Sequence, residues 1–304
     1  MKLKNFTFRN IRKWFRMVTG RSILHVNQGP GKHYSTLEIK GYYNDLTEKI
    51  SKDKERDEKY IPKQKTGKNI EFEFSIEIFQ YGLAAYDLFL ETGEKKYLNK
   101  FLIMVEWAHD KQKNNGAWDT FVERHPKHPY SAMAQGEGIS LLVRAYVHTK
   151  EDKYQSAAKK AYDFMLIPIE EGGTTLYDND LVFLKEYTHL PTVLNGWIFA
   201  LFGIYDYYLI TNDEEVHKFF ELNARSIAYC LPQYDNGYWS KYDIDHKIAS
   251  PFYHNLHISQ LRVLNELTNN ETFSEYADKW EKYASKRRNR RKAFWQKARQ
   301  KLSE

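Results

Sequence analysis

The chain has 304 residues but only one cysteine, Cys230. A disulfide framework within the chain is therefore excluded, and a reducing compartment is compatible with the composition. The sequence also lacks the uninterrupted apolar run that a secretory signal or a membrane span requires. We therefore expect a cytoplasmic protein.

Familiar enzyme motifs are also missing. The sequence contains no HExxH metal motif, no phosphate-binding loop and no nucleophile elbow. A glycosidase carboxylate pair stays open as an alternative, with Glu186 and either Asp243 or Asp245. A metal site also stays open, although we expect none; its ligands would be Asp243, His246, His254 and His257.

Acidic residues are nearly absent from both ends of the chain. Residues 1–21 hold seven Lys or Arg and no acid, and residues 286–304 hold nine with only Glu304. Such ends favour a polyanion or the inner face of an anionic membrane as a neighbour. The first segment fits a helix lying on a membrane or packed on the protein body. Its apolar face would consist of Phe8, Ile11, Trp14, Phe15 and Val18.

Aromatic residues are abundant instead. They make up 16% of the sequence, with 23 Tyr and 7 Trp. Carbohydrate-binding surfaces use such side chains, because an aromatic face packs on sugar C–H groups while tyrosine offers a hydroxyl. A tyrosine-rich helical core explains the same composition, so this observation alone does not separate the two interpretations.

Helical periodicity dominates the chain after a polar, charged loop at 48–70. Short turns with helix-capping residues join the expected helices in pairs. The pairs are 72–92 with 96–112, 131–149 with 152–167, 191–211 with 213–230, and 252–268 with 272–288. The expected parts of the chain are an N-terminal segment and arm (1–67), a catalytic domain (68–285) and a basic tail (286–304).

Longer connections rich in glycine and aromatic residues separate the pairs. Gly116, Gly172 and Gly237 each follow a second helix, which indicates a weak helical-hairpin repeat. About four such hairpins would form a mainly α protein, an α/α-barrel or toroid, with the connections around one cleft. The stretches "NNGAW", "GGTTLY" and "NGYWSKY" predict small β-hairpins at its rim.

Titratable groups concentrate in two of these connections. Glu186 and Tyr187 lie in one, Tyr242 lies in another, and Tyr253 opens the following helix. This combination suits proton abstraction next to a carboxylate, which needs a base on one side of the carbon and an acid on the other. Nearby positive charge would lower the tyrosine pKa from its usual value of about 10.

Four stretches resemble one enzyme family, the D-glucuronyl C5-epimerases of heparan sulfate and heparin biosynthesis. They are "QYGLAAY" (80–86), "PYSAMAQGEGISLLVRAYVHTK" (129–150), "KEYTHLPTVLNGWIFALFGIYD" (185–206) and "LPQYDNGYWSKYDIDH…YHNLHISQL" (231–261). They match the family patterns QYGL..Y, YSAMAQG…IS.LVRAY, EYP…VLNG…L.GLYD and LP.YDTGSGTIYD…YHTTHI.QL, in the same order. The first 67 residues look like those of shorter bacterial relatives.

The resemblance implies an α/α-barrel enzyme, often dimeric, that converts D-glucuronate to L-iduronate within a heparosan-like polymer. It would remove and return the C5 proton without a cofactor. Glu186 and Tyr253 match the opposed acid and base of the family, and Tyr187 and Tyr242 match the assisting tyrosines. The positions expected to contact substrate are Gln80, Tyr86, Tyr130, Gln135, Asn195, His246, His254 and His257.

This sequence departs from the family pattern in three places, one of which is a shorter connection between Tyr242 and Tyr253. YDLRH becomes "YDIDH", so Asp245 replaces an arginine expected near the substrate carboxylate, and EYP becomes "EYT". Lys185 and the three histidines are candidates to replace that arginine. We expect a homodimer that binds an anionic glucuronate polymer and no nucleic acid. A polysaccharide lyase or a non-catalytic polysaccharide-binding protein are the alternatives.

Overall fold

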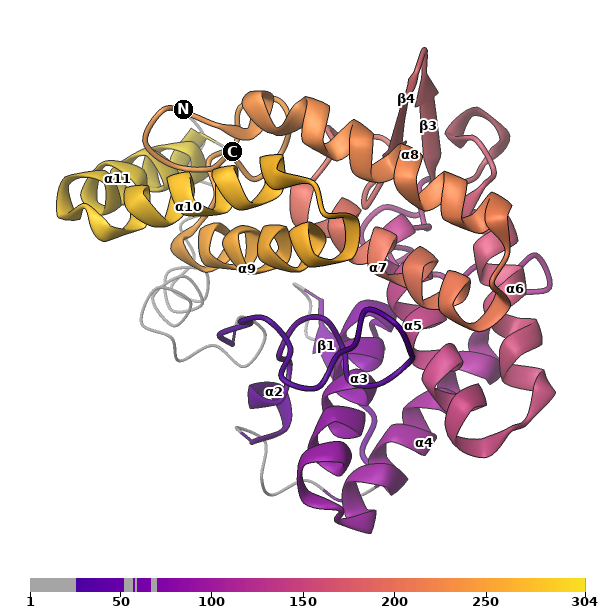
Figure 1. The fold of residues 1–304 in the computed structure, drawn as a ribbon. Helices are drawn as coiled ribbons and strands as arrows, with labels where there is room; N and C mark the ends of the chain where they lie inside the picture. The colour runs from indigo at the N-terminus through magenta and orange to yellow at the C-terminus, as the bar shows by residue number, and fades with distance from the viewer. Residues whose placement is uncertain (1–25, 52–56, 58, 67–69, 304) are drawn as a thin grey trace.

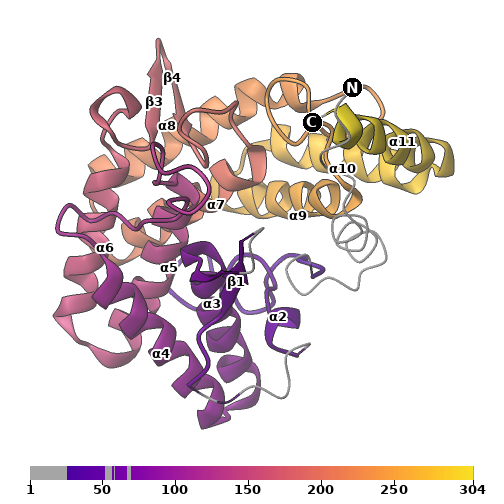
Figure 2. The ribbon, with the colours of Figure 1, turned by 180° about the vertical axis from the view of Figure 1, so that it is seen from behind.

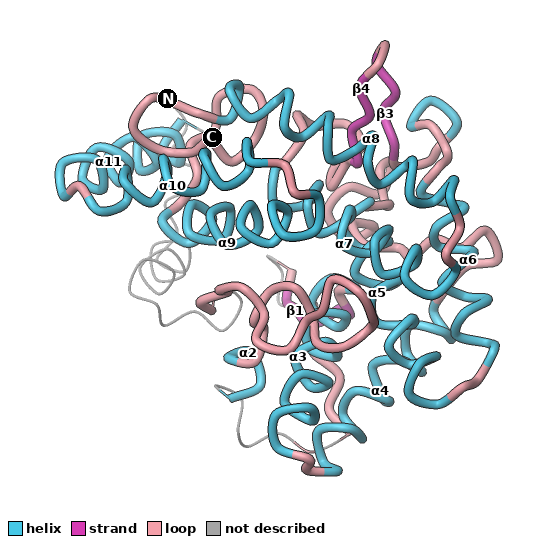
Figure 3. Tube along the Cα trace, in the orientation of Figure 1, coloured by secondary structure: helices cyan, strands magenta, loops and turns pink. Residues whose placement is uncertain are grey.

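A computed structural model describes residues 26–51, 57, 59–66 and 70–303. The expected apolar helix face between Phe8 and Val18 lies outside these residues. The described chain is mainly helical, and its named strands lie in two small hairpins (Figure 3). The mainly α class expected from the sequence is therefore confirmed.

Eight of the described helices form the four expected pairs, with bounds that differ from the predicted ones by a few residues. The pairs are α3 (Ser75–Thr92) with α4 (Lys95–Lys111), α5 (Ala132–Thr149) with α6 (Asp152–Met165), α7 (Leu194–Thr211) with α8 (Glu214–Cys230), and α9 (Pro251–Thr268) with α10 (Glu271–Ser285). The first helix of each pair ends at a residue in the left-handed region, which closes the turn. These residues are Gly93, Lys150, Asn212 and Asn269.

The first helices of the pairs form the interior. Helix α3 packs on α5, α5 on α7, and α7 on α9, and each also packs on its own partner. Helices α5 and α7 come especially close, because Gly136 and Gly203 face each other. A Cβ atom on Gly203 would lie 2.2 Å from the carbonyl oxygen of Gly136. These two positions therefore require glycine.

An arm formed by residues 26–47 crosses between α3 and α9 (Figures 1 and 2). Its Tyr34 hydroxyl donates a 2.5 Å hydrogen bond to Glu266 on α9, and its Tyr42 amide donates a 2.8 Å bond to Asp87 on α3. The packing that we observe thus runs in series from α3 to α9, with the arm in between. Closure into a complete toroid stays a prediction.

A buried ion pair fixes the arm to the central helices. Arg144 on α5 and Asp206 on α7 are 2.6 Å apart, and both side chains are 1% exposed. The guanidinium also donates to the carbonyl oxygens of Lys40 (2.9 Å) and Gly41 (2.8 Å) in the arm. Tyr43 donates to Asp206 over 2.8 Å. The arm thus contributes hydrogen bonds that partly satisfy two buried charges.

All these arm contacts lie near the C-terminal ends of α3, α5, α7 and α9. The C-terminal halves of the four interior helices therefore lie on the side of the arm, and their N-terminal ends lie on the other side. Three of the segments that hold the expected catalytic residues lead into or open these helices. The candidate site therefore lies on the side away from the arm.

The strands agree only in part with the prediction. Strands β3 (Thr175–Asp178) and β4 (Leu181–Leu184) form an antiparallel hairpin that includes "GGTTLY", as expected. The prediction is wrong for "NNGAW", which forms a turn, and "NGYWSKY" makes only isolated bridges. A second hairpin, β1 (Lys63–Lys65) with β2 (Glu71–Glu73), starts within the segment that we expected to be a loop.

Two further helices were not predicted. Helix α2 (Glu48–Ser51) packs on α3, and α11 (Arg287–Ser303) follows α10 directly. The basic stretch after residue 286 therefore forms a helix that packs on α9 and α10. Within the described residues, no helix has the length and apolar character needed to cross a membrane.

The buried ion pair predicts that two arginines contribute very different amounts to the free energy of unfolding. Arg144→Ala leaves Asp206 buried without its partner, and we expect it to lower the free energy of unfolding by about 3–5 kcal/mol. Arg262 pairs with Asp278 and Glu281 but is 38% exposed. Arg262→Ala should lower it by less than about 1 kcal/mol. Urea unfolding measures both, and equal effects would contradict the role given to Arg144.

Candidate active site

The four expected catalytic residues come together at the N-terminal ends of α7 and α9. Glu186 and Tyr187 follow strand β4, Tyr242 lies in the connection before α9, and Tyr253 lies in its first turn. The charge of Glu186 acts on all three tyrosines, and Tyr253 acts on Tyr187 and Tyr242. The structure thus assembles one carboxyl group and three phenols from distant parts of the sequence.

Backbone hydrogen bonds hold Glu186 in place. The amide of the preceding Lys185 donates to Thr174 (2.9 Å), and its carbonyl accepts from Ala132 at the start of α5 (2.9 Å). On the other side, Glu186 lies against α7 at Gly196. A Cβ atom there would come within 2.5 Å of Glu186 Oε2. Glycine at 196 therefore makes room for the carboxyl group.

Aromatic contacts orient the tyrosines. The Tyr187 ring stacks on Phe121 with centroids 4.4 Å apart, and the Tyr242 and Tyr253 rings are 4.8 Å apart. Ser250 caps α9 through the amide of Tyr253, which fixes the first turn of that helix. All three tyrosines are half-buried.

The connection that carries Tyr242 is attached to the start of α7. The carbonyl of Tyr242 accepts from Leu194, and the amide of Ile244 donates to Thr192 over 2.9 Å. Val193 and Asp243 form a β-bridge between these bonds. Tyr242 therefore keeps a fixed position relative to the helix that borders Glu186.

Burial dominates the electrostatics of this group. Desolvation raises the pKa of Glu186 to about 7, although a hydrogen bond from Tyr187 acts in the opposite direction. Burial and the charge of Glu186 raise the pKa of Tyr242, Tyr253 and Tyr187. Near neutral pH, Glu186 can therefore exchange a proton while the tyrosines remain protonated.

Sequence reasoning missed two charged residues near this group. Glu137 on α5 is buried, and its Oε1 accepts a 2.7 Å hydrogen bond from Gln80. Desolvation, with Glu186 as a further contribution, raises its pKa. Desolvation lowers the pKa of the buried Lys49, which interacts with Glu137. Glu137 was visible as an acid on an apolar helical stretch, whereas Lys49 was hidden in a charged segment.

Three of the buried oxygens that lack a donor belong to this site. In the described part of the chain, Glu186 Oε2, Glu137 Oε2 and Asn195 Oδ1 are buried and make no hydrogen bond. Leaving such an atom unpaired costs about 1–3 kcal/mol. These three oxygens are acceptors that sugar hydroxyl groups can satisfy.

Other expected substrate-contacting residues serve the surrounding framework. Gln135 is buried and its amide donates to Gly116 (3.0 Å) and Ala161 (3.2 Å). Tyr130 packs on Phe164 with centroids 5.0 Å apart. Tyr86 packs on Phe101 near the arm end of α3. The structure therefore places Tyr86 away from the four catalytic candidates.

The three histidines do not converge on a common point. Ring nitrogens of His254 and His257 lie 2.8 and 3.1 Å from Ser240 Oγ, whereas His246 is exposed and pairs with Asp245. Desolvation lowers the pKa of His254 to about 4 and also lowers that of His257. Both buried histidines are therefore neutral, and they bridge a serine within the framework.

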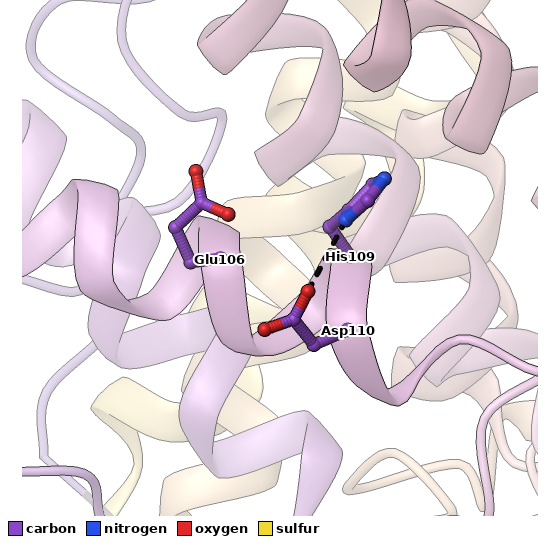
Figure 4. Close-up of side chains that lie close together, drawn as sticks. All are labelled: Glu106, His109 and Asp110. Atoms are coloured by element: carbon purple, nitrogen blue, oxygen red, sulfur yellow. Dashed lines mark hydrogen bonds and ion pairs between the residues drawn. The ribbon is translucent and has the colours of Figure 1, made fainter.

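One other group of metal-ligating side chains is present in the described residues. Glu106, His109 and Asp110 lie on α4, with ligand atoms within 4.8 Å of one another (Figure 4). The ammonium group of Lys153 lies 3.2 Å from Glu106, which also accepts from Tyr154. Lys153 and Tyr154 thus already bind the carboxylate of Glu106, so we interpret the group as a surface ion-pair network.

The alternative glycosidase pair also loses support. Asp243 is buried and accepts hydrogen bonds from the backbone amides of His246 (3.1 Å) and Lys247 (2.9 Å). Asp245 is exposed and pairs with the His246 ring. Asp243 thus shapes the turn after Tyr242, and Asp245 lies on the surface.

Comparison with known proteins identifies the family of the chain. Residues 111–282, more than half of the chain, match the family described as D-glucuronyl C5-epimerase C-terminus. The chain therefore belongs to the D-glucuronyl C5-epimerase C-terminal family, whose enzymes are isomerases. The matched segment contains all four catalytic candidates, but α3 with Gln80, the arm and α11 lie outside it.

Two curated relatives are similar over part of their length. A D-glucuronyl C5-epimerase of Caenorhabditis elegans is 31% identical over 219 residues, which is 62% of this chain and 36% of the relative. An uncharacterized protein of Methanocaldococcus jannaschii is 31% identical over 155 residues, which is 49% of this chain and 50% of the relative. The similarity thus spans a third to a half of these relatives.

The raised pKa of Glu186 predicts a pH-dependent stability difference. The folded pKa of about 7 exceeds the usual 4.5, so the folded state binds this proton more tightly. The resulting stability is present below pH 4.5 and is lost as the pH rises through 7, about 1.4 kcal/mol for each pKa unit. Glu186→Gln should therefore melt above the wild type at pH 8, and the difference should shrink at pH 5.

Thermal unfolding at the two pH values measures this effect. The exposed Glu123 provides a matched control, and Glu123→Gln should melt like the wild type at both. Burial raises the pKa of Asp87 to about 7. Asp87 is present in all three proteins, so its contribution to the pH dependence cancels in the comparison. A pH-independent difference for Glu186→Gln would show that its carboxyl group is not the source.

Proposed function

We propose that this protein is a polysaccharide uronate C5-epimerase that converts D-glucuronate to L-iduronate in a heparosan-like polymer. The observation that carries the proposal is the mutual interaction of Glu186 with three tyrosines. The family and the relative from Caenorhabditis elegans support the same reaction type. In this proposal the helices close into an α/α-barrel around the substrate.

The reaction needs two groups on opposite faces of C5. In one direction, the Glu186 carboxylate takes the C5 proton and the electron pair moves toward the uronate carboxyl group. The Tyr253 hydroxyl then gives a proton to the opposite face, which inverts C5. The tyrosinate regains a proton and Glu186 loses one to solvent, so no net proton is consumed. The reverse reaction exchanges the two roles.

The neighbouring groups suit this division of roles. A pKa of about 7 leaves a large fraction of Glu186 as carboxylate near neutral pH, while burial keeps Tyr253 protonated. Tyr242 donates a hydrogen bond to Tyr253, which stabilises the tyrosinate after proton transfer. Tyr187 likewise donates a hydrogen bond to Glu186, which stabilises its carboxylate form. Gln80, Glu137 and Asn195 would contact sugar hydroxyl groups.

Charge at the end of the chain fits a polyanionic substrate. Helix α11 exposes several arginines, which would attract a glucuronate polymer in a salt-dependent manner. The exposed arginines are Arg287, Arg288, Arg290, Arg291 and Arg299. We propose polymer binding for this basic end, and an anionic membrane surface is the competing partner. Salt titration of polymer and liposome binding separates the two.

Proton NMR of heparosan incubated in deuterated water tests the proposed reaction. The wild type should replace the H5 proton of glucuronate with deuterium and produce iduronate signals. Glu186→Gln and Tyr253→Phe should each lower the rate of iduronate formation at least about a hundredfold, since each removes a proton-transfer group. Tyr177→Phe should match the wild type, because Tyr177 lies on β3 and its hydroxyl donates to Leu166.

The product decides between the competing functions. An ultraviolet-absorbing unsaturated sugar without iduronate would mean a lyase, because a lyase expels the C4 oxygen after the same first step. Polymer binding without any exchange would mean a binding protein. Near-normal iduronate formation in Glu186→Gln or Tyr253→Phe would contradict the roles assigned to these residues.

A further inference from the structure

Helix α11 packs against the connection that carries Tyr242. The Gln300 side chain accepts a hydrogen bond from the amide of Ile248 (3.0 Å) and donates one to the carbonyl of His246 (2.9 Å). Gln296 accepts from the hydroxyl of Tyr238. Ala293 is 1% exposed and belongs to a small apolar cluster with Trp239, Ile248 and Ala249. The helix therefore clamps residues 238–248 from the outside.

Lys297 extends this clamp to the catalytic candidate itself. Its ammonium group donates a 2.7 Å hydrogen bond to the carbonyl of Ile248 and lies 5.5 Å from the centroid of the Tyr242 ring. Ile248 is bridged to Lys241, and the amide of Tyr242 donates to Lys247. The Lys297 side chain thus contacts the Ile248 backbone on one side of the loop and the face of the Tyr242 ring on the other.

The charge of Lys297 is opposite to the other influences on Tyr242. The groups that raise the pKa of Tyr242, after burial, are Glu186, Tyr253, Tyr187 and Asp243. A cation within about 6 Å of an aromatic face is attracted to it and favours negative charge on the ring substituent. Lys297 is half-buried, so water screens this interaction only in part.

We infer that Lys297 is a positioning residue of the active site, which holds the Tyr242 loop and supplies positive charge behind the Tyr242 ring. The inference rests on the proposed function for its catalytic consequence. Lys297 lies outside the segment that matches the family, residues 111–282. This chain therefore completes its site with a C-terminal helix that the family match does not include.

Three variants of the full-length protein test this inference. Lys297→Met should lower kcat about tenfold with KM within threefold, since the lost contact acts on Tyr242 rather than on the polymer. Lys297→Arg should recover most of the rate, because a guanidinium keeps both the charge and the donor. Lys292 lies 3.8 Å from the centroid of the Tyr238 ring on the same helix and loop. Lys292→Met should keep kcat within twofold of the wild type.

Two readouts separate the role of Lys297 from general stability. The alkaline limb of the kcat–pH profile should move to higher pH in Lys297→Met and return in Lys297→Arg, at an unchanged melting temperature. Amide hydrogen exchange of residues 240–249 should also rise in Lys297→Met and not in Lys292→Met. The exchange readout needs no activity, so it distinguishes failure of this inference from failure of the proposed function.

The outcomes that overturn the inference are equally specific. Wild-type exchange of residues 240–249 in Lys297→Met would exclude the clamp, whether or not the protein is an epimerase. A rate loss in Lys292→Met as large as in Lys297→Met would assign the effect to docking of α11 as a whole. A rate loss without a shift of the pH profile would leave no role for the charge behind Tyr242.

Discussion

The buried ion pair between Arg144 and Asp206 is the constraint on which the rest of the structure depends. It joins α5 to α7 and, through the carbonyls of Lys40 and Gly41, ties both helices to the arm. Removing a partner from a buried ion pair leaves an uncompensated charge, which is strongly destabilising. The arm and the two central helices must therefore assemble together. Their assembly sets the direction of the interior helices and, at the opposite end, the position of the candidate site.

The site itself opposes stability. Glu186 and Glu137 are buried carboxyl groups whose pKa values are raised, and each has an oxygen that accepts no hydrogen bond within the described residues. The hydrogen-bonded framework around the site holds these groups in place despite this local penalty. Three side chains illustrate that framework. His254 and His257 hydrogen-bond with Ser240, and Gln135 hydrogen-bonds with a backbone carbonyl.

Sequence patterns predicted the parts of the fold that depend on local periodicity. The four helical pairs and the β3–β4 hairpin follow from apolar spacing and turn residues, and the four catalytic candidates do come together. The β1–β2 hairpin and α11 were missed because their segments are polar and charged, and tertiary contacts rather than propensity stabilise them. Lys49, Glu137 and Lys297 were missed for a related reason, since only the folded chain shows that Glu137 lies near Glu186, Lys49 near Glu137, and Lys297 near Tyr242.

The placement of the N-terminal ends of α5, α7 and α9 has an electrostatic consequence. A helix carries about half a unit of positive charge at its N-terminal end, where amide groups lack partners within the helix. Helix α5 begins beside Lys185, α7 begins against Glu186, and α9 carries Tyr253 in its first turn. Three dipoles thus direct their positive ends toward the same small volume. Negative charge that develops there meets an oriented field from the backbone, which no single side-chain substitution removes.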